Sequence, residues 1–136
     1  NLGSGSELSR LKDLVMTFNL TKQVIFIDEN ITSSRIYNES KIHIMPTITT
    51  PDSVEGFGIS NIEAAAFGLP CIVSDSGGTP ESISKNGTIV KENNLKDLSK
   101  GIIDVMNNLD KLSKKSHQMA KKFENKKKIK EYLDSF

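Results

Sequence analysis

Four short β-type runs alternate with helical patterns along the chain, and this alternation constrains the fold more than any other feature. The runs cover residues 24–27, 42–45, 71–74 and 88–90. Strands that alternate with helices assemble into a parallel sheet with helices on its faces. The sequence therefore predicts an α/β fold.

Apolar spacing and end signals predict five helical segments. The first spans residues 7–18, and its apolar stripe is expected to face the sheet. A shorter helix begins near residue 32 and ends before 42, and a third spans 58–67, where Gly68-Leu69-Pro70 ends it. A fourth covers 95–109, and a lysine-rich helical stretch runs from 111 to 136 with a break near Asn125.

Length and composition place the chain among ordinary globular domains. Its 136 residues fit one domain, and 36% hydrophobic and 26% charged residues with a net charge of +1 exclude a disordered tail. No apolar run reaches the roughly 18–20 residues that span a bilayer, and the first residues do not resemble a signal peptide. The single cysteine, Cys71, lies in an apolar run, so we expect a buried, inert thiol in a reducing cytoplasm.

Two unusual segments follow neighbouring strands, at the edge of a parallel sheet where ligands bind. The first is Glu55-Gly56-Phe57-Gly58-Ile59-Ser60-Asn61-Ile62-Glu63, and the second is Asp75-Ser76-Gly77-Gly78-Thr79-Pro80-Glu81. Gly56 and Gly58 leave the start of a helix bare, so its backbone N–H groups can approach a phosphate. Carboxylates such as Glu55 and Glu63 repel phosphate but accept hydrogen bonds from hydroxyl groups. A ligand that carries both phosphate and hydroxyl groups fits this combination, which suggests a sugar nucleotide.

The full order of motifs resembles the C-terminal, nucleotide-sugar-binding domain of retaining GT-B glycosyltransferases of family 4, the glycosyl transferases group 1. The matching strings are Gly3-Ser4-Gly5-Ser6-Glu7, Val24-Ile25-Phe26, the Glu55 to Glu63 segment, Gly68-Leu69-Pro70-Cys71-Ile72 and Gly77-Gly78-Thr79-Pro80-Glu81. Pro46-Thr47 replaces the usual Pro-Ser, and Lys41 stands where an acidic residue is usual. The resemblance covers nearly the whole chain and implies a Rossmann-like parallel sheet.

The resemblance also implies a role for each site residue. Glu55 is the catalytic residue and contacts the hydroxyls of the donor sugar, and Glu63 holds the ribose. Gly56, Phe57, Gly58 and Ile59 bind the sugar and diphosphate, Ile27 and Asp28 lie on the nucleobase side, and Gly77 and Gly78 form a donor loop. Two structural alternatives stay open: Phe57 could plug a helix interface, and Glu81 could cap the helix after Pro80.

The implied reaction transfers a sugar from a nucleotide sugar, linked to UDP or GDP, to a glycan or lipid-linked acceptor with retention of configuration. It needs no cofactor and no metal, and His43 and His117 have no nearby sequence partners that would make a metal motif. In the family, an Arg and a Lys upstream of anything in this sequence neutralise the diphosphate.

In the family, this domain has six parallel strands in the order 3-2-1-4-5-6. The four runs correspond to strands three to six, so residues 1–136 are expected to be a partial donor-binding domain that lacks its first strand and most of its second. Residues 110–136 form its basic C-terminal helical segment. The N-terminal Rossmann domain, which supplies the acceptor wall, is also missing, so we expect no useful transferase activity from these residues alone.

Rival interpretations come from other classes of protein. A non-catalytic GT-B partner or chaperone subunit would usually lose the acidic donor contacts, and a GT-B sugar-nucleotide epimerase fits the Glu-Gly-Phe-Gly string less well. Nine lysines in residues 111–130 allow peripheral docking at the inner face of a membrane by an otherwise cytoplasmic enzyme, although a solvated helix is the simpler interpretation. Nucleic-acid binding is disfavoured, because tryptophan is absent and only Tyr37 and Tyr132 are tyrosines.

Overall fold

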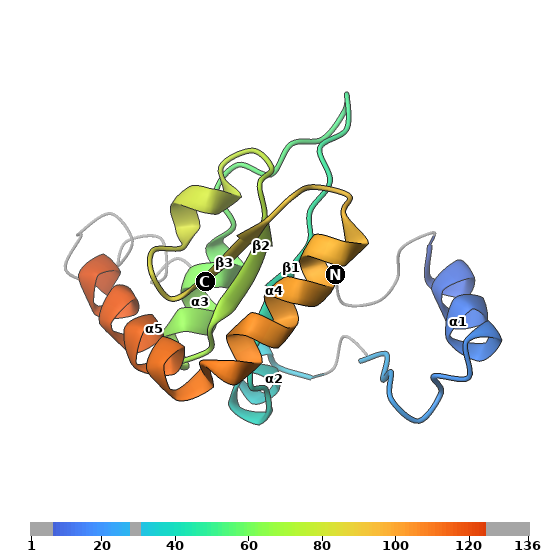
Figure 1. Ribbon diagram of the computed structural model, residues 1–136, viewed down its shortest axis with the longest axis horizontal. Coiled ribbons are helices and arrows are strands. Elements are labelled where there is room, and N and C mark those ends of the chain that lie inside the picture. The colour runs from blue at the N-terminus through green and yellow to red at the C-terminus, as the bar shows by residue number, and fades with distance from the viewer. Residues whose placement is uncertain (1–6, 28–30, 125–136) are drawn as a thin grey trace. The chain divides into compact units, whose positions relative to one another are not determined.

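A computed structural model of the chain describes residues 7–27 and 31–124 (Figure 1). The chain divides into two compact units, Asn1–Ile36 and Tyr37–Phe136. The second unit holds the sheet and both glycine motifs.

The first unit contains helix α1 (Leu8–Thr17), at the position predicted from its apolar spacing. None of its residues is buried, so the packing of its apolar stripe on a sheet is not seen in the described part of this unit. Helix α2 (Ser33–Glu39) spans the boundary between the two units and also agrees with the sequence prediction.

The predicted strand at residues 24–27 is wrong, because the structure describes these residues as irregular chain. No β-bridge among the described residues involves them, and the side chain of Ile25 is 81% exposed. A β-type run becomes a strand only when its backbone groups pair with a neighbouring strand. Local composition alone therefore does not predict a strand, because it does not reveal whether a pairing partner is present.

The second unit is built on a parallel sheet of three described strands in the order β1-β2-β3. They are β1 (His43–Met45), β2 (Cys71–Ser74) and β3 (Gly87–Val90). This is the order expected of strands four to six of the family domain. The central strand β2 is buried along its whole length, as an apolar run in a parallel sheet should be.

Helices cover both faces of this sheet (Figure 1). They are α3 (Ile59–Ala66), α4 (Leu95–Asn107) and α5 (Leu109–Glu124), together with the 3₁₀ helix η1 (Thr79–Ser82). Side chains alternate along a strand, so Cys71 and Val73 pack with Ala64 of α3, while Ile72 packs with Val105 of α4 on the opposite face. This fixes α3, which carries the first glycine motif, on one face of the sheet.

Helix α3 ends at the predicted Gly68-Leu69-Pro70 signal. The N–H groups of Gly68 and Leu69 donate to the carbonyl oxygens of Ala65 and Ala64 at 2.9 and 3.0 Å, which is the Schellman arrangement. Hydroxyl groups of α5 then reach this end, since Ser113 Oγ donates to the Gly68 carbonyl at 2.7 Å. Helix α5 thus holds the C-terminal end of α3 in place.

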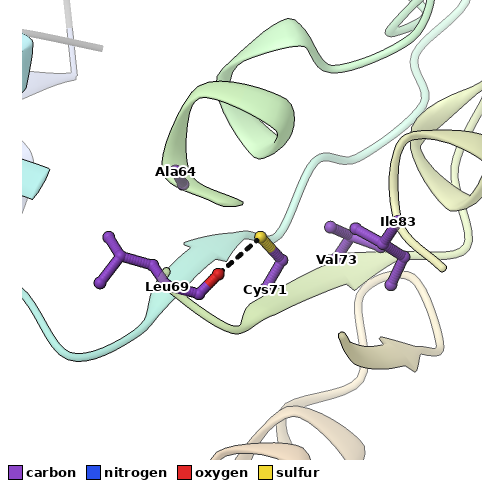
Figure 2. Close-up of a cluster of buried hydrophobic side chains, with 5 residues drawn as sticks. All are labelled: Ala64, Leu69, Cys71, Val73 and Ile83. Carbon is purple, nitrogen blue, oxygen red and sulfur yellow. Dashed lines mark hydrogen bonds between the residues drawn. The ribbon is translucent and has the colours of Figure 1, made fainter. Parts of the chain in front are cut away.

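Cys71 lies in the buried cluster on the α3 face (Figure 2). Its Sγ lies 3.6 Å from the carbonyl oxygen of Leu69, and burial raises the pKa of the thiol to about 12. The prediction of a buried thiol is therefore confirmed. Separately, none of the described helices combines the length and apolar character needed to cross a bilayer.

Candidate functional site

The first glycine motif forms a tight turn into the N-terminus of α3. Gly58 is the N-cap and has a φ of 76°, in the left-handed region. A Cβ atom at Gly58 would come within 2.6 Å of the Asn61 side-chain amide. The fold of the protein itself therefore requires glycine at position 58.

The Glu55 carboxylate lies at this helix end. Its Oε1 accepts a hydrogen bond of 3.2 Å from the backbone N–H of Gly58. The N–H groups of Ile59 and Ser60 begin the helix and therefore have no acceptor within it. A carboxylate that can accept hydroxyl hydrogen bonds thus stands beside N–H donors that favour an anion.

Gly56 differs from Gly58 in what surrounds it. A Cβ atom at Gly56 would meet nothing within 4 Å, and the residue is exposed. Packing within the protein therefore does not explain the glycine at position 56. The open space beside it is free for a ligand.

The second glycine motif touches the first through backbone atoms. The N–H of Gly78 donates a 3.0 Å hydrogen bond to the carbonyl oxygen of Glu55. A Cβ atom at Gly78 would stand 1.9 Å from the carbonyl oxygen of Gly56, and one at Gly77 would stand 2.2 Å from that of Glu55. The structure thus brings the two motifs together at the carboxyl ends of β1 and β2, as the sequence suggested.

A buried hydroxyl network fixes this junction. The Thr79 hydroxyl lies 2.6 Å from the carbonyl oxygens of Ser74 and Ser76. Asn61 Nδ2 donates to Ser82 Oγ at 2.7 Å and so links α3 to η1. Sequence reasoning missed Asn61 and Ser82, although Asn61 lies inside the first motif string. Nothing in one sequence pairs two polar residues from separate segments.

Thr49 ties the loops that follow all three strands. Its hydroxyl shares a 2.7 Å hydrogen bond with that of Ser76, after β2. Its backbone N–H donates to the carboxylate of Glu92, which follows β3. Hydrogen bonds therefore connect the three loops at the carboxyl edge of the sheet.

Glu63 lies on α3 and is half-buried. Its Oε2 accepts a 3.2 Å hydrogen bond from the hydroxyl of Tyr37. Burial, followed by the negative charge of Glu63, raises the pKa of Tyr37 to about 12. Sequence reasoning noted Tyr37 only as one of the two tyrosines and missed this contact.

The ring of Phe57 packs against helix α5. The ring meets Phe123 of α5 edge to face, with centroids 6.4 Å apart, and packs against a cluster that includes Ile62 and Met119. This arrangement favours the interpretation that the ring plugs the α3–α5 interface. The backbone of Phe57 remains part of the turn.

The remaining predicted residues differ in exposure and in the unit to which they belong. Ile59, the first residue of α3, is 37% exposed. Ile27 belongs to the first unit and Asp28 lies outside the described residues, so the nucleobase side stays a prediction. Glu81 is exposed in the first turn of η1.

A cavity of about 220 Å³ opens at the carboxyl edge. Its lining is mostly apolar and comprises Pro46, Ile48, Ser74, Val90, Lys91, Asn93, Asn94, Leu95 and Leu98. None of the predicted site residues lines it, so the glycine motifs lie outside this hollow. Within residues 7–27 and 31–124, no group of three His, Cys, Asp or Glu side chains could hold a metal ion.

Comparison with known proteins supplies the family context for this geometry. The family model described as glycosyl transferases group 1 matches residues 2–129. An uncharacterised glycosyltransferase of Haemophilus influenzae is 31% identical over 137 residues, which covers 96% of this chain and 37% of that protein.

Solved structures share the same fold. The sucrose-phosphate synthase of Thermosynechococcus elongatus superposes with a TM-score of 0.73 at 25% identity, covering 86% of this chain and 30% of that one. A pneumococcal O-GlcNAc transferase, GtfA, solved with UDP and GlcNAc, gives a TM-score of 0.74 at 23% identity and covers 98% of this chain and 28% of that one. The chain thus spans about a third of the length of these proteins.

Proposed function

Because the chain belongs to the glycosyl transferases group 1 family, we propose that it is the donor-binding part of a glycosyltransferase that uses a nucleotide sugar. One observation carries the proposal: the Glu55 carboxylate lies beside the N–H donors that begin α3, at the carboxyl edge of the sheet. A diphosphate and sugar hydroxyls need these two kinds of group side by side.

In this proposal the donor lies across the two glycine motifs. The diphosphate faces the backbone of Gly56 to Ile59, and the donor sugar hydroxyls reach Glu55. Glu63 binds the ribose. The donor loop of Gly77 and Gly78 packs against the backbone of Glu55 and Gly56 and so supports the turn that binds the donor. The UDP held by the similar pneumococcal transferase supports UDP over GDP as the donor nucleotide.

The chemistry proposed for this site is transfer with retention of configuration and without a metal. Charge develops on the departing diphosphate, and preorganised N–H donors at a helix N-terminus lower the energy of that charge. The first turn of α3 supplies such donors. Further cations would come from chain segments that precede this sequence in the family.

The acceptor proposed is a glycan or lipid-linked glycan of the cell envelope. In the family, its wall comes from an N-terminal Rossmann domain, which lies outside residues 1–136. These residues alone should therefore bind a donor without transferring sugar efficiently. Robust turnover by residues 1–136 alone would contradict this proposal.

Peripheral contact with the inner face of a membrane is a second part of the proposal, and the charge pattern of α5 favours it. Helical geometry places its lysines within an arc of about 120°, opposite the packed side chains of Ser116, Met119 and Ala120. The arc comprises Lys111, Lys114, Lys115, Gln118, Lys121 and Lys122 and holds no carboxylate. Each lysine near anionic lipid contributes about 1 kcal/mol to binding.

Vesicle flotation tests this membrane contact. The full-length protein should float with vesicles of anionic lipid at low salt and remain free at high salt, because charge attraction is screened. Replacing Lys114 and Lys121 by Glu should weaken flotation. Replacing Lys96 and Lys100, which lie on α4, by Glu serves as the matched control and should leave flotation unchanged.

The proposed activity is tested with the full-length protein and a panel of nucleotide sugars. We expect one donor to be consumed in the presence of acceptor, and Glu55→Ala and Glu63→Ala to lower the rate. Donor binding without transfer would favour a partner or chaperone subunit. Conversion of the free donor to an epimer would favour a sugar-nucleotide epimerase. Full activity in both variants would remove the basis of the proposal.

A further inference from the structure

The Tyr37 hydroxyl makes a directed contact with one of the two motif carboxylates. Tyr37 Oη lies 3.2 Å from Glu63 Oε2 and 3.5 Å from the carbonyl oxygen of Ser60. The tyrosine is on α2 and the glutamate on α3, so this contact joins two helices. A phenol hydroxyl carries one proton, and the carboxylate is the stronger acceptor.

The ring of Tyr37 is held on several sides. It lies 5.4 Å from the ring of Phe67 and meets the ring of His43 edge to face at 6.0 Å. It also packs against the buried cluster drawn in Figure 2. A ring packed in this way presents its hydroxyl at a fixed position.

A fixed hydroxyl restricts the carboxylate that it contacts. A glutamate side chain on a helix surface samples several rotamers and loses that freedom when it binds a ligand. A hydrogen bond already made by Oε2 removes part of this loss in advance. A carboxylate has about four lone-pair positions, so Oε1 and the remaining position on Oε2 stay available for hydroxyls.

We propose that Tyr37 is a positioning residue that holds the Glu63 carboxylate in the orientation that accepts the ribose hydroxyls of the donor nucleotide. The inference rests on the ribose-binding role proposed for Glu63. Tyr37 itself does not touch the nucleotide in this account.

Ribose and its deoxy analogue should respond differently to the loss of the Tyr37 hydroxyl. Tyr37→Phe keeps the packed ring and removes only the hydroxyl. In the full-length protein we expect it to weaken binding of uridine diphosphate about three- to tenfold, the range of a single hydrogen bond. Binding of 2′,3′-dideoxyuridine diphosphate should stay within about twofold, because that analogue has no hydroxyls for Glu63 to accept. Titration calorimetry measures both affinities.

Two further variants separate positioning from structural support. Phe67→Leu disturbs the same ring cluster without removing the Tyr37 hydroxyl, so it should lower the melting temperature and leave the ribose preference unchanged. Glu63→Ala should abolish the preference, and adding Tyr37→Phe to it should produce no further loss.

The possible results distinguish a failure of the positioning role of Tyr37 from a failure of the ribose-binding role of Glu63. If Glu63→Ala abolishes the ribose preference while Tyr37→Phe leaves it at the parent value, the role of Tyr37 is wrong and the role of Glu63 stands. If Tyr37→Phe weakens both nucleotides equally, Tyr37 is a structural residue and the inference is overturned. If Glu63→Ala leaves the preference intact, the proposed role of Glu63 fails, and the inference fails with it.

Discussion

The backbone N–H of Gly78 donates a 3.0 Å hydrogen bond to the carbonyl oxygen of Glu55. This bond joins the loop after β2 to the loop after β1 and so unites the two glycine motifs. Part of each motif therefore serves the protein's own packing, because Gly58 and Gly78 have no room for a side chain. Gly56, whose surroundings are open, is the glycine best explained by a ligand.

Gly78→Ala should destabilise the protein. The added Cβ would stand 1.9 Å from the Gly56 carbonyl oxygen, so the two loops would have to separate. Overpacking of this kind costs about 1–3 kcal/mol in the free energy of unfolding. Urea unfolding followed by circular dichroism measures the change. An unchanged midpoint would show that the two loops are not tightly joined.

Gly56→Ala provides the opposite case. Its added methyl group meets no protein atom, so the free energy of unfolding should stay within about 0.5 kcal/mol of the parent value. If the donor lies against this backbone, its affinity in the full-length protein should fall about tenfold, which corresponds to about 1.4 kcal/mol. Equal donor affinity in the variant and the parent would place the donor elsewhere.

Ile72→Ala should cost much more stability than the same change one strand away. Ile72 of β2 is 0% exposed and packs against Val105 of α4, and deletion of such a side chain costs about 2–5 kcal/mol. Ile89 on β3 is 50% exposed and serves as the matched control. Similar losses in the two variants would contradict the described core.

The buried thiol of Cys71 should make the free energy of unfolding fall with pH in the alkaline range. Burial raises the pKa of Cys71 to about 12, whereas an unfolded thiol loses its proton near pH 8.5. Between pH 9 and 10 the unfolded chain releases this proton and the folded protein retains it. The free energy of unfolding should therefore fall as pH rises, by up to about 1.4 kcal/mol per pH unit from this group.

Cys71→Ala isolates the thiol from other groups that titrate at alkaline pH. Its free energy of unfolding, measured in urea at pH 8, 9 and 10, should decline less steeply than that of the parent. Tyr37, whose pKa is also raised to about 12, adds to the slope from about pH 9 upward, but it does so in both proteins. Identical slopes between pH 9 and 10 would show that the thiol is accessible to solvent.

Local signals predicted most of the secondary structure. The apolar run at β2 and the Gly68-Leu69-Pro70 stop both lie where the sequence placed them, because an apolar run and a helix-ending signal are local features of the sequence. The run at residues 24–27 failed because a strand depends on a partner that local composition does not reveal. The same limit applies to side-chain pairs such as Tyr37 with Glu63.

The positions of the site motifs could be predicted from the sequence, but the roles of single residues within them were less predictable. Strand order alone brings the segments of Glu55 and Gly78 to one edge of the sheet. Sequence could not decide the role of Phe57, because its partner Phe123 lies at the far end of α5. Such packing between distant segments is not visible in the sequence.

The rate of sugar transfer by the full-length protein carrying Glu55→Gln tests the central claim most directly. This change keeps the size of the side chain and removes the charge beside the first turn of α3. The account predicts a transfer rate at least 100-fold lower, about 2.7 kcal/mol in the barrier, with the affinity for uridine diphosphate alone within about threefold of the parent. A transfer rate equal to that of the parent would contradict it.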